Sequence, residues 1–184
     1  MHLIAVGSNL SVGDRTIRET IKEAFSLFEK YTGVSPIPSR FFSTPAFPAG
    51  SGPDFVNAAF AAHSPLEPRQ MLDVLHRIEA ELGRERQERW GPRVVDLDLI
   101  AVGQAVAPSV TVWQHWHDLS ADDQARRAPD TLVLPHPRMQ DRSFVLGPLM
   151  DIAPDWRHPV LGRSVHEMHA ARPEAERASV RPIA

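Results

Sequence analysis

The sequence contains no cysteine and only two lysines, and it has no long apolar run. The absence of cysteine excludes a disulfide framework, a thiolate metal site and a cysteine nucleophile. A membrane-spanning helix needs about 18 to 20 consecutive apolar residues, which no segment supplies. The N-terminal residues also lack the basic region that opens a signal peptide. These absences predict a cytoplasmic protein that has no membrane partner.

An excess of positive charge is absent as well, because 20 Lys and Arg residues stand against 23 Asp and Glu residues. Proteins that bind nucleic acid in general are basic, so the net charge of −3 predicts no nucleic-acid partner and confines any polyanion site to a local cluster. Hydrophobic residues at 42% exclude wholesale disorder. The length predicts one domain over residues 1–171, with an insertion at about 103–131, followed by a flexible tail over 172–184.

Three familiar catalytic patterns are missing too. The segment Gly7-Ser8-Asn9 has neither the spacing nor the lysine of a P-loop, and the zinc motif HExxH does not occur. No Ser/His/Asp triad can be argued from the spacing of those residues. Phosphate chemistry, if present, must therefore rest on other groups.

Hydrophobic periodicity predicts an α+β fold. Strands are predicted over residues 3–6, 40–43, 55–62 and 94–102, one helix between an Asp14 cap and Lys30, and another between Pro68 and Gly83. The order strand, helix, strand, strand, helix, strand is that of the ferredoxin-like split βαβ fold, an antiparallel sheet with both helices on one face. The insertion and a C-terminal extension are added to this unit.

The most informative stretch is Val95-Asp96-Leu97-Asp98-Leu99. Residues two apart on a strand share a face, so the two aspartates project together while their neighbours point into the core. Adjacent carboxylates repel each other, and a divalent ion such as Mg²⁺ removes that repulsion. Salt bridges to nearby arginines, or a solvated polar face, would explain the same pattern.

The loop before this strand carries Arg84, Arg86, Arg89 and Arg93. A guanidinium group can donate two hydrogen bonds at once to a phosphate, so this concentration beside the paired aspartates indicates a metal-bridged polyphosphate. A surface loop whose glutamates neutralise its arginines is the alternative. Trp90, within the loop, is interpreted as a packing residue.

Two further clusters complete the candidate site. His136 and Arg142 could contact the same anion, although a lone histidine is more often structural. Phe55 and Asn57 could stack on a flat ring and read its hydrogen-bonding edge. A core position explains Phe55 equally well.

Five sequence blocks occur in one order between residue 3 and about residue 160. They are Gly7-Ser8-Asn9-Leu10; Thr44-Pro45 with Phe55-Val56-Asn57-Ala58-Ala59; Glu79 with Gly83-Arg84-Glu85-Arg86; Arg89-Trp90-Gly91-Pro92-Arg93 with Asp96-Leu97-Asp98; and Leu134-Pro135-His136 with Arg142-Ser143-Phe144. Together they closely resemble the 6-hydroxymethyl-7,8-dihydropterin pyrophosphokinase family of the folate pathway. The fourth block is very specific, whereas the first alone would be weak. Phe55 departs from the family pattern, because many members have tyrosine there.

The resemblance implies transfer of pyrophosphate from ATP, the co-substrate, to the pterin hydroxymethyl group, with release of AMP, in tetrahydrofolate biosynthesis. It implies a monomer that acts on these two small molecules, two Mg²⁺ ions held by Asp96 and Asp98, and an arginine-rich loop that closes as a lid. The catalytic residues implied are Arg84, Arg93, Asp96 and Asp98. The ATP-binding residues implied are Glu79, Arg84, Arg86, Arg89, Trp90, Arg93, Ile100, His136 and Arg142. The pterin-binding residues implied are Thr44, Pro45, Phe47, Phe55, Asn57, Asp96 and Phe144.

Two other functions stay open from the residues alone. The acidic pair would suit a two-metal phosphohydrolase or nuclease. The predicted topology is shared by RNA-binding modules of the RRM type, although no aromatic RNP1 pattern lies on a central strand.

Overall fold

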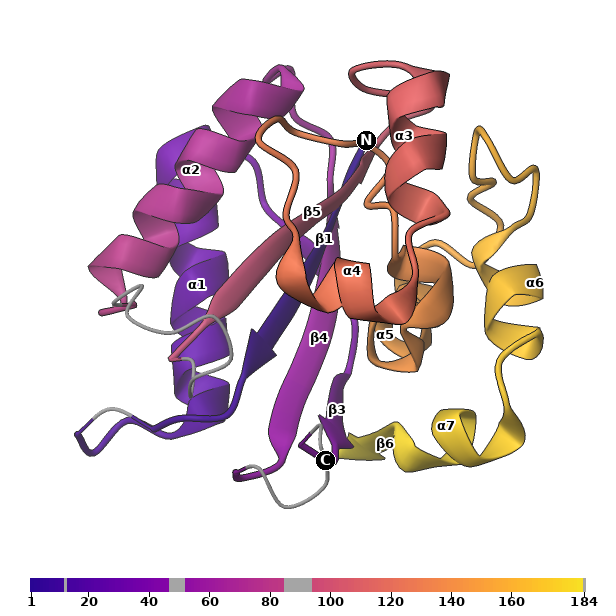
Figure 1. Cartoon of the computed structure of the whole chain (residues 1–184). Helices are drawn as coiled ribbons and strands as arrows, with labels where there is room; N and C mark the ends of the chain where they lie inside the picture. Colours follow the sequence, from indigo (N-terminus) through magenta and orange to yellow (C-terminus); the bar gives the residue numbers. More distant parts are fainter. Residues whose placement is uncertain (12, 47–51, 85–93, 184) are drawn as a thin grey trace.

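The computed structural model describes residues 1–11, 13–46, 52–84 and 94–183, and its centre is a six-stranded antiparallel sheet (Figure 1). The strands are β1 (His2–Ser8), β2 (Ile37–Pro38), β3 (Phe41–Thr44), β4 (Phe55–Ala62), β5 (Asp96–Val102) and β6 (Arg181–Ile183). Their order is β5-β1-β4-β3-β6, and β2 also pairs with β4. The ferredoxin-like arrangement predicted from the sequence is therefore confirmed.

Two helices cover one face of the sheet, as predicted. They are α1 (Ile17–Thr32) and α2 (Pro68–Glu81), and their apolar residues pack against Ile4, Val6 and Phe60 in one core cluster. The predicted Asp14 cap is wrong. Thr16 caps α1 instead, because its hydroxyl accepts the Glu19 N–H while the Glu19 carboxylate accepts the Thr16 N–H at 2.8 Å.

The opposite face is covered as well, by helices that the sequence analysis did not assign. These are α5 (Ser143–Ile152) and α6 (Val165–Ala170). They pack on small side chains of β1 and β4, among them Ala5, Ala59 and Ala61, in a second core cluster. The small residues let α5 approach the sheet closely, and Arg142, the residue before α5, lies beside Asp98 of β5.

The predicted insertion contains α3 (Val110–His117) and α4 (Ala121–Arg126), and the 3₁₀ helix η1 (Met139–Asp141) follows it. Trp113 is completely buried, and its indole N–H donates to the Pro135 carbonyl at 2.8 Å. This indole packs α3 against the segment around Pro135, which leads into α5.

The prediction of a flexible tail is wrong for residues 172–183. This segment forms α7 (Glu174–Ser179) and then β6, which pairs with β3. Backbone hydrogen bonding along the edge of β3 stabilises this strand, and composition does not reveal such an interaction. Among the helices within the described residues, none is both long and apolar enough to cross a membrane.

Candidate active site

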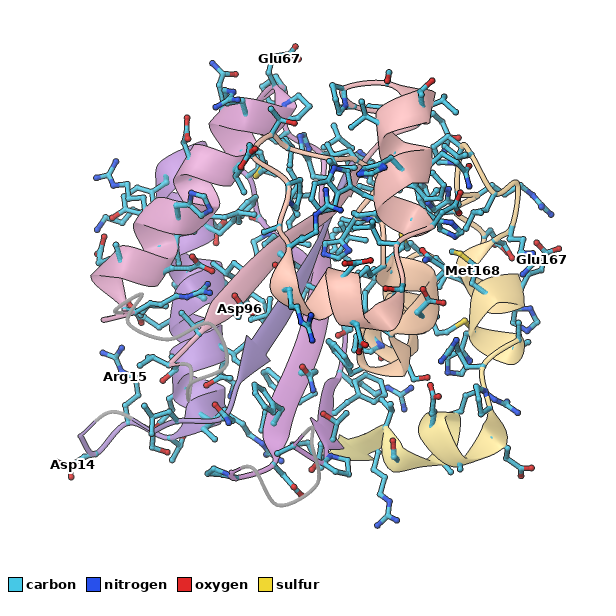
Figure 2. All side chains as sticks on the ribbon, viewed as in Figure 1. Asp14, Arg15, Glu67, Asp96, Glu167 and Met168 are labelled. Atoms are coloured by element: carbon cyan, nitrogen blue, oxygen red, sulfur yellow. The ribbon has the colours of Figure 1, made fainter. Side chains whose placement is uncertain are left out.

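The two aspartates of β5 lie on one face of the sheet, as predicted. Asp96 pairs with Gly7 and Asp98 pairs with Ala5, whereas Leu97 and its neighbour two positions on belong to the opposite core. Figure 2 shows Asp96 near the start of β5, close to the end of α2. The carboxylates are partly exposed, with side-chain exposures of 19% for Asp96 and 40% for Asp98. They are accessible to a ligand while their strand stays in the core.

Each aspartate has an arginine beside it. Arg84 Nη1 lies 2.5 Å from Asp96 Oδ1, and Arg142 Nη1 lies 3.7 Å from Asp98 Oδ2. The salt bridges to nearby arginines that the sequence left open as an explanation are therefore present. The positive charges of Arg84 and Arg142 offset the repulsion between the two carboxylates.

Glu79 stabilises the pairing of Arg84 with Asp96 from the buried side of the site. Its carboxylate is almost completely buried, forms an ion pair with Arg84, and accepts the backbone N–H of Leu97 at 2.8 Å. Glu79 therefore joins α2 to β5 and keeps Arg84 over Asp96. Its predicted contact with ATP stays a prediction.

His136 reaches the same site through the backbone of β5. The backbone N–H of His136 donates to the Ile100 carbonyl at 2.8 Å, and the ring Nδ1 of His136 accepts the backbone N–H of Arg138 at 3.1 Å. Burial, and then the positive charges of Arg142 and Arg138, lower the pKa of His136 to about 3, although Asp96 acts in the opposite direction. At neutral pH the imidazole is uncharged with its proton on Nε2, which makes it a hydrogen-bond donor. The Ile100 side chain itself is fully buried.

A second set of polar groups lies on β4 and β3, which are separated from the aspartates of β5 by β1. In the register of the sheet, Asn57 and Asp96 both pair with Gly7, so the glycine lies between them. Asn57 and Thr44 are buried, and the Asn57 amide nitrogen donates to the Thr44 hydroxyl at 2.7 Å. A Cβ on Gly7 would come within 3.2 Å of Asn57 Oδ1 and 3.9 Å of the Phe55 ring. The glycine lets the Asn57 amide oxygen lie close over β1, and sequence reasoning missed this because strand register had to be known.

The aromatic residues differ in exposure. Phe55 is half-buried on the same side of β4 as Asn57. Phe144, in the first turn of α5, is 41% exposed, and the Arg142 guanidinium lies 5.7 Å from its ring centroid. The stacking role of Phe55 and Phe144 stays a prediction.

A protein-family model described as 7,8-dihydro-6-hydroxymethylpterin-pyrophosphokinase (HPPK) matches residues 3–154. The chain belongs to this family. The Pseudomonas aeruginosa protein named 2-amino-4-hydroxy-6-hydroxymethyldihydropteridine pyrophosphokinase is 39% identical over 175 residues, which cover 92% of this chain and 90% of that protein. The Haemophilus influenzae protein of the same name is 31% identical over 152 residues, which cover 83% of this chain and 81% of that protein.

Among solved structures, the Plasmodium falciparum HPPK-DHPS wild type superposes on this HPPK-family chain with a TM-score of 0.60 at 15% identity. The match covers 92% of this chain and 44% of that one, and it supports the fold. The comparisons give no support to a phosphohydrolase, a nuclease or an RNA-binding module.

Several predicted residues of the family site lie outside the described residues. They are Phe47, Arg86, Arg89, Trp90 and Arg93. The arginine-rich lid stays a prediction for the same reason. Of the remaining predicted residues, Pro45 is exposed directly after β3, and the others occupy the positions given above.

Proposed function

We propose that this chain is an ATP-dependent diphosphotransferase that transfers pyrophosphate from ATP to 6-hydroxymethyl-7,8-dihydropterin. The products are the pterin diphosphate and AMP, and the reaction belongs to tetrahydrofolate biosynthesis. The observation that carries the proposal is the pair Asp96 and Asp98 on one face of β5, flanked by Arg84 and Arg142, in a chain of the HPPK family.

The donor set at β5 fits Mg²⁺. This ion prefers oxygen ligands and is usually held by one or two carboxylates together with phosphate oxygens and water. Asp96 and Asp98 supply carboxylate oxygens that are partly exposed and lie on one face, so we assign them as the ligands of two Mg²⁺ ions. Bound Mg²⁺ would neutralise phosphate charge and make the attacking hydroxyl more acidic.

The cationic and donor groups of the chain then orient the triphosphate. Arg84 and Arg142 lie beside the carboxylates and can each donate paired hydrogen bonds to phosphate oxygens. His136 contributes a neutral Nε2–H donor at physiological pH. Transfer of this kind depends on positioning and on charge neutralisation, so no protein nucleophile is required.

We assign the pterin to the space over Gly7. Asn57 and Thr44 are buried there and hydrogen-bonded to each other, so their positions are set before the ligand arrives. The Asn57 amide oxygen can accept from an N–H on the edge of the ring. Phe55 and Phe144 supply aromatic surface for stacking.

Product analysis tests the proposal directly. Purified protein with MgATP and hydroxymethyldihydropterin is expected to release AMP and pterin diphosphate in equal amounts, and omission of either substrate should stop both. AMP formed without the pterin, or ADP formed in place of AMP, would contradict the assignment. A titration of the pterin with and without a Mg-bound non-hydrolysable ATP analogue then tests whether the two sites are coupled.

A further inference from the structure

The C-terminal segment from Arg172 to Ile183 contacts both sides of the space that we assign to the pterin. It leaves α6, forms α7 next to α5, and ends as β6 beside β3 (Figure 1). One side of this space includes Thr44, the last residue of β3. The other includes Phe144, in the first turn of α5. A single segment therefore contacts two elements that are far apart in the sequence.

The contacts to α5 surround Arg142. Ser143, which follows it, donates its hydroxyl proton to Glu176 Oε2 at 3.3 Å. Asp141, which precedes it, lies 3.6 Å from the Arg172 guanidinium. Arg172 also donates through Nη2 to the same Glu176 oxygen at 2.7 Å. The residues on both sides of Arg142 are thus held by one Arg172–Glu176 pair of the C-terminal segment.

Close packing continues this contact along α5. A Cβ on Gly147 would come within 2.8 Å of Val180 Cγ1, so glycine lets the α7–β6 junction pack against α5. Three residues further, Ile183 pairs with Phe41, and Arg181 pairs with Ser43 next to Thr44. Arg142 begins the first turn of α5, because its carbonyl accepts the backbone N–H groups of Val145 and Leu146, both at 3.0 Å.

We infer that Glu176 is a positioning residue for pterin binding: through Ser143 and Arg172 it sets where the first turn of α5 holds Arg142 and Phe144 relative to β3. The inference rests on the proposed function, because Phe144 matters here only as a wall of the pterin site. Within the part of the chain that the structure describes, Glu176 contacts none of Asp96, Asp98 and Asn57, so its effect is on affinity and not on the chemical step.

The test uses point variants of the full chain. Glu176→Ala is expected to raise the KM for the pterin by about three- to tenfold, the size of one charge-assisted hydrogen bond at a half-exposed site. The KM for ATP should rise by a smaller factor than the pterin KM, because Arg142 is only one of several groups that orient the triphosphate, and kcat should change by less than about twofold. Glu174→Ala is the matched control, because Glu174 lies on the same helix, is exposed, and has no ion pair or hydrogen bond within the described residues. It should behave as the wild type.

Two further measurements separate positioning from a general loss of stability. Hydrogen exchange in the first turn of α5 should be faster in Glu176→Ala than in Glu174→Ala, with equal melting temperatures. Because Ser143 and Glu176 act through one hydrogen bond, the double variant Ser143→Ala/Glu176→Ala should have the same pterin KM as Glu176→Ala alone.

Three results would overturn the inference. An unchanged pterin KM in Glu176→Ala, with an active wild type, would refute the positioning role alone. Equal losses for ATP and pterin would show a general structural effect. A wild type that neither binds the pterin nor requires it for AMP release would refute the proposed function itself, and the assignment of Glu176 with it.

Discussion

Arg84 and Asp96 form an ion pair that joins the segment after α2 to the first residue of β5, with Nη1 2.5 Å from Oδ1. The same Nη1 contacts Glu79, whose carboxylate is buried and also accepts the Leu97 N–H. One guanidinium therefore serves a buried structural carboxylate and a partly exposed functional one. The consequence is that stability and activity are coupled at this position.

Replacing Arg84 with alanine should lower the free energy of unfolding by about 1–3 kcal/mol, because the Glu79 carboxylate is left buried without its cation. The double variant Arg84→Ala/Glu79→Gln should recover part of that loss, since a buried neutral amide costs less than a buried charge. Urea denaturation measures both. Arg69→Ala on the exposed side of α2 is the control, and equal stabilities for Arg84→Ala and this control would contradict the prediction.

Replacing Asp98 with alanine should reduce AMP formation by about a hundred- to a thousandfold and leave the melting temperature close to that of the wild type. The side chain is 40% exposed, and its ion pair with Arg142 is long at 3.7 Å, so little stability depends on that pair. Steady-state rates and thermal melts test the two halves. Asp155→Ala removes an exposed carboxylate elsewhere and should keep full activity. Near-normal turnover in Asp98→Ala would argue against a metal site on β5.

Replacing Gly7 with alanine should raise the pterin KM by roughly five- to twentyfold, because the new methyl group would displace Asn57, whose Oδ1 lies 3.2 Å from the Cβ position. The KM for ATP should stay within about twofold. Gly52→Ala is a suitable control, since among the described residues its Cβ would meet only Asn9 Nδ2 at 3.8 Å. If both variants bind the pterin equally well, the ligand does not occupy the space over Gly7.

His158 should make the protein less stable in mild acid. The residue is fully buried, its Nδ1 accepts the N–H groups of Val160 and Leu161 at 3.2 Å, and its ring lies 4.9 Å from that of Trp113. Burial, and then the charge of His117, lower the pKa of His158 to about 4. The unfolded chain therefore binds the proton first, and stability is complete above pH 6.5 and is lost as the pH falls from 6.5 toward 4.

The loss between pH 6.5 and pH 5 should be on the order of 2 kcal/mol from this group. Urea denaturation at pH 7.5, 6.5 and 5.0 measures it. In His158→Gln, which keeps a side-chain acceptor for the two N–H groups, the dependence on pH should be shallower, although not absent, because the pKa of His136 is lowered as well. An unchanged slope in the variant would show that His158 does not contribute.

Local patterns accounted for much of the fold. The strand that contains Phe55, the helix that begins at Pro68, and the common face of Asp96 and Asp98 were all predictable, because period-2 and period-3.6 patterns are set by neighbours in the chain. The helix α5 was not assigned, since six of its ten residues are buried and it shows no clear polar face. The segment β6 was mistaken for part of a tail, since its stability comes from backbone pairing with β3.

The sequence by itself determined which groups the site contains: two carboxylates two residues apart, a run of arginines beside them, and polar residues that mark a known family. The tertiary structure alone decided which of these groups meet. Arg142 reaches Asp98 across 44 positions of sequence, His136 hydrogen-bonds to β5, and Gly7 separates Asn57 from Asp96. Such contacts depend on strand register and on how α5 packs on the sheet, which are properties of the whole chain and not of any short stretch of it.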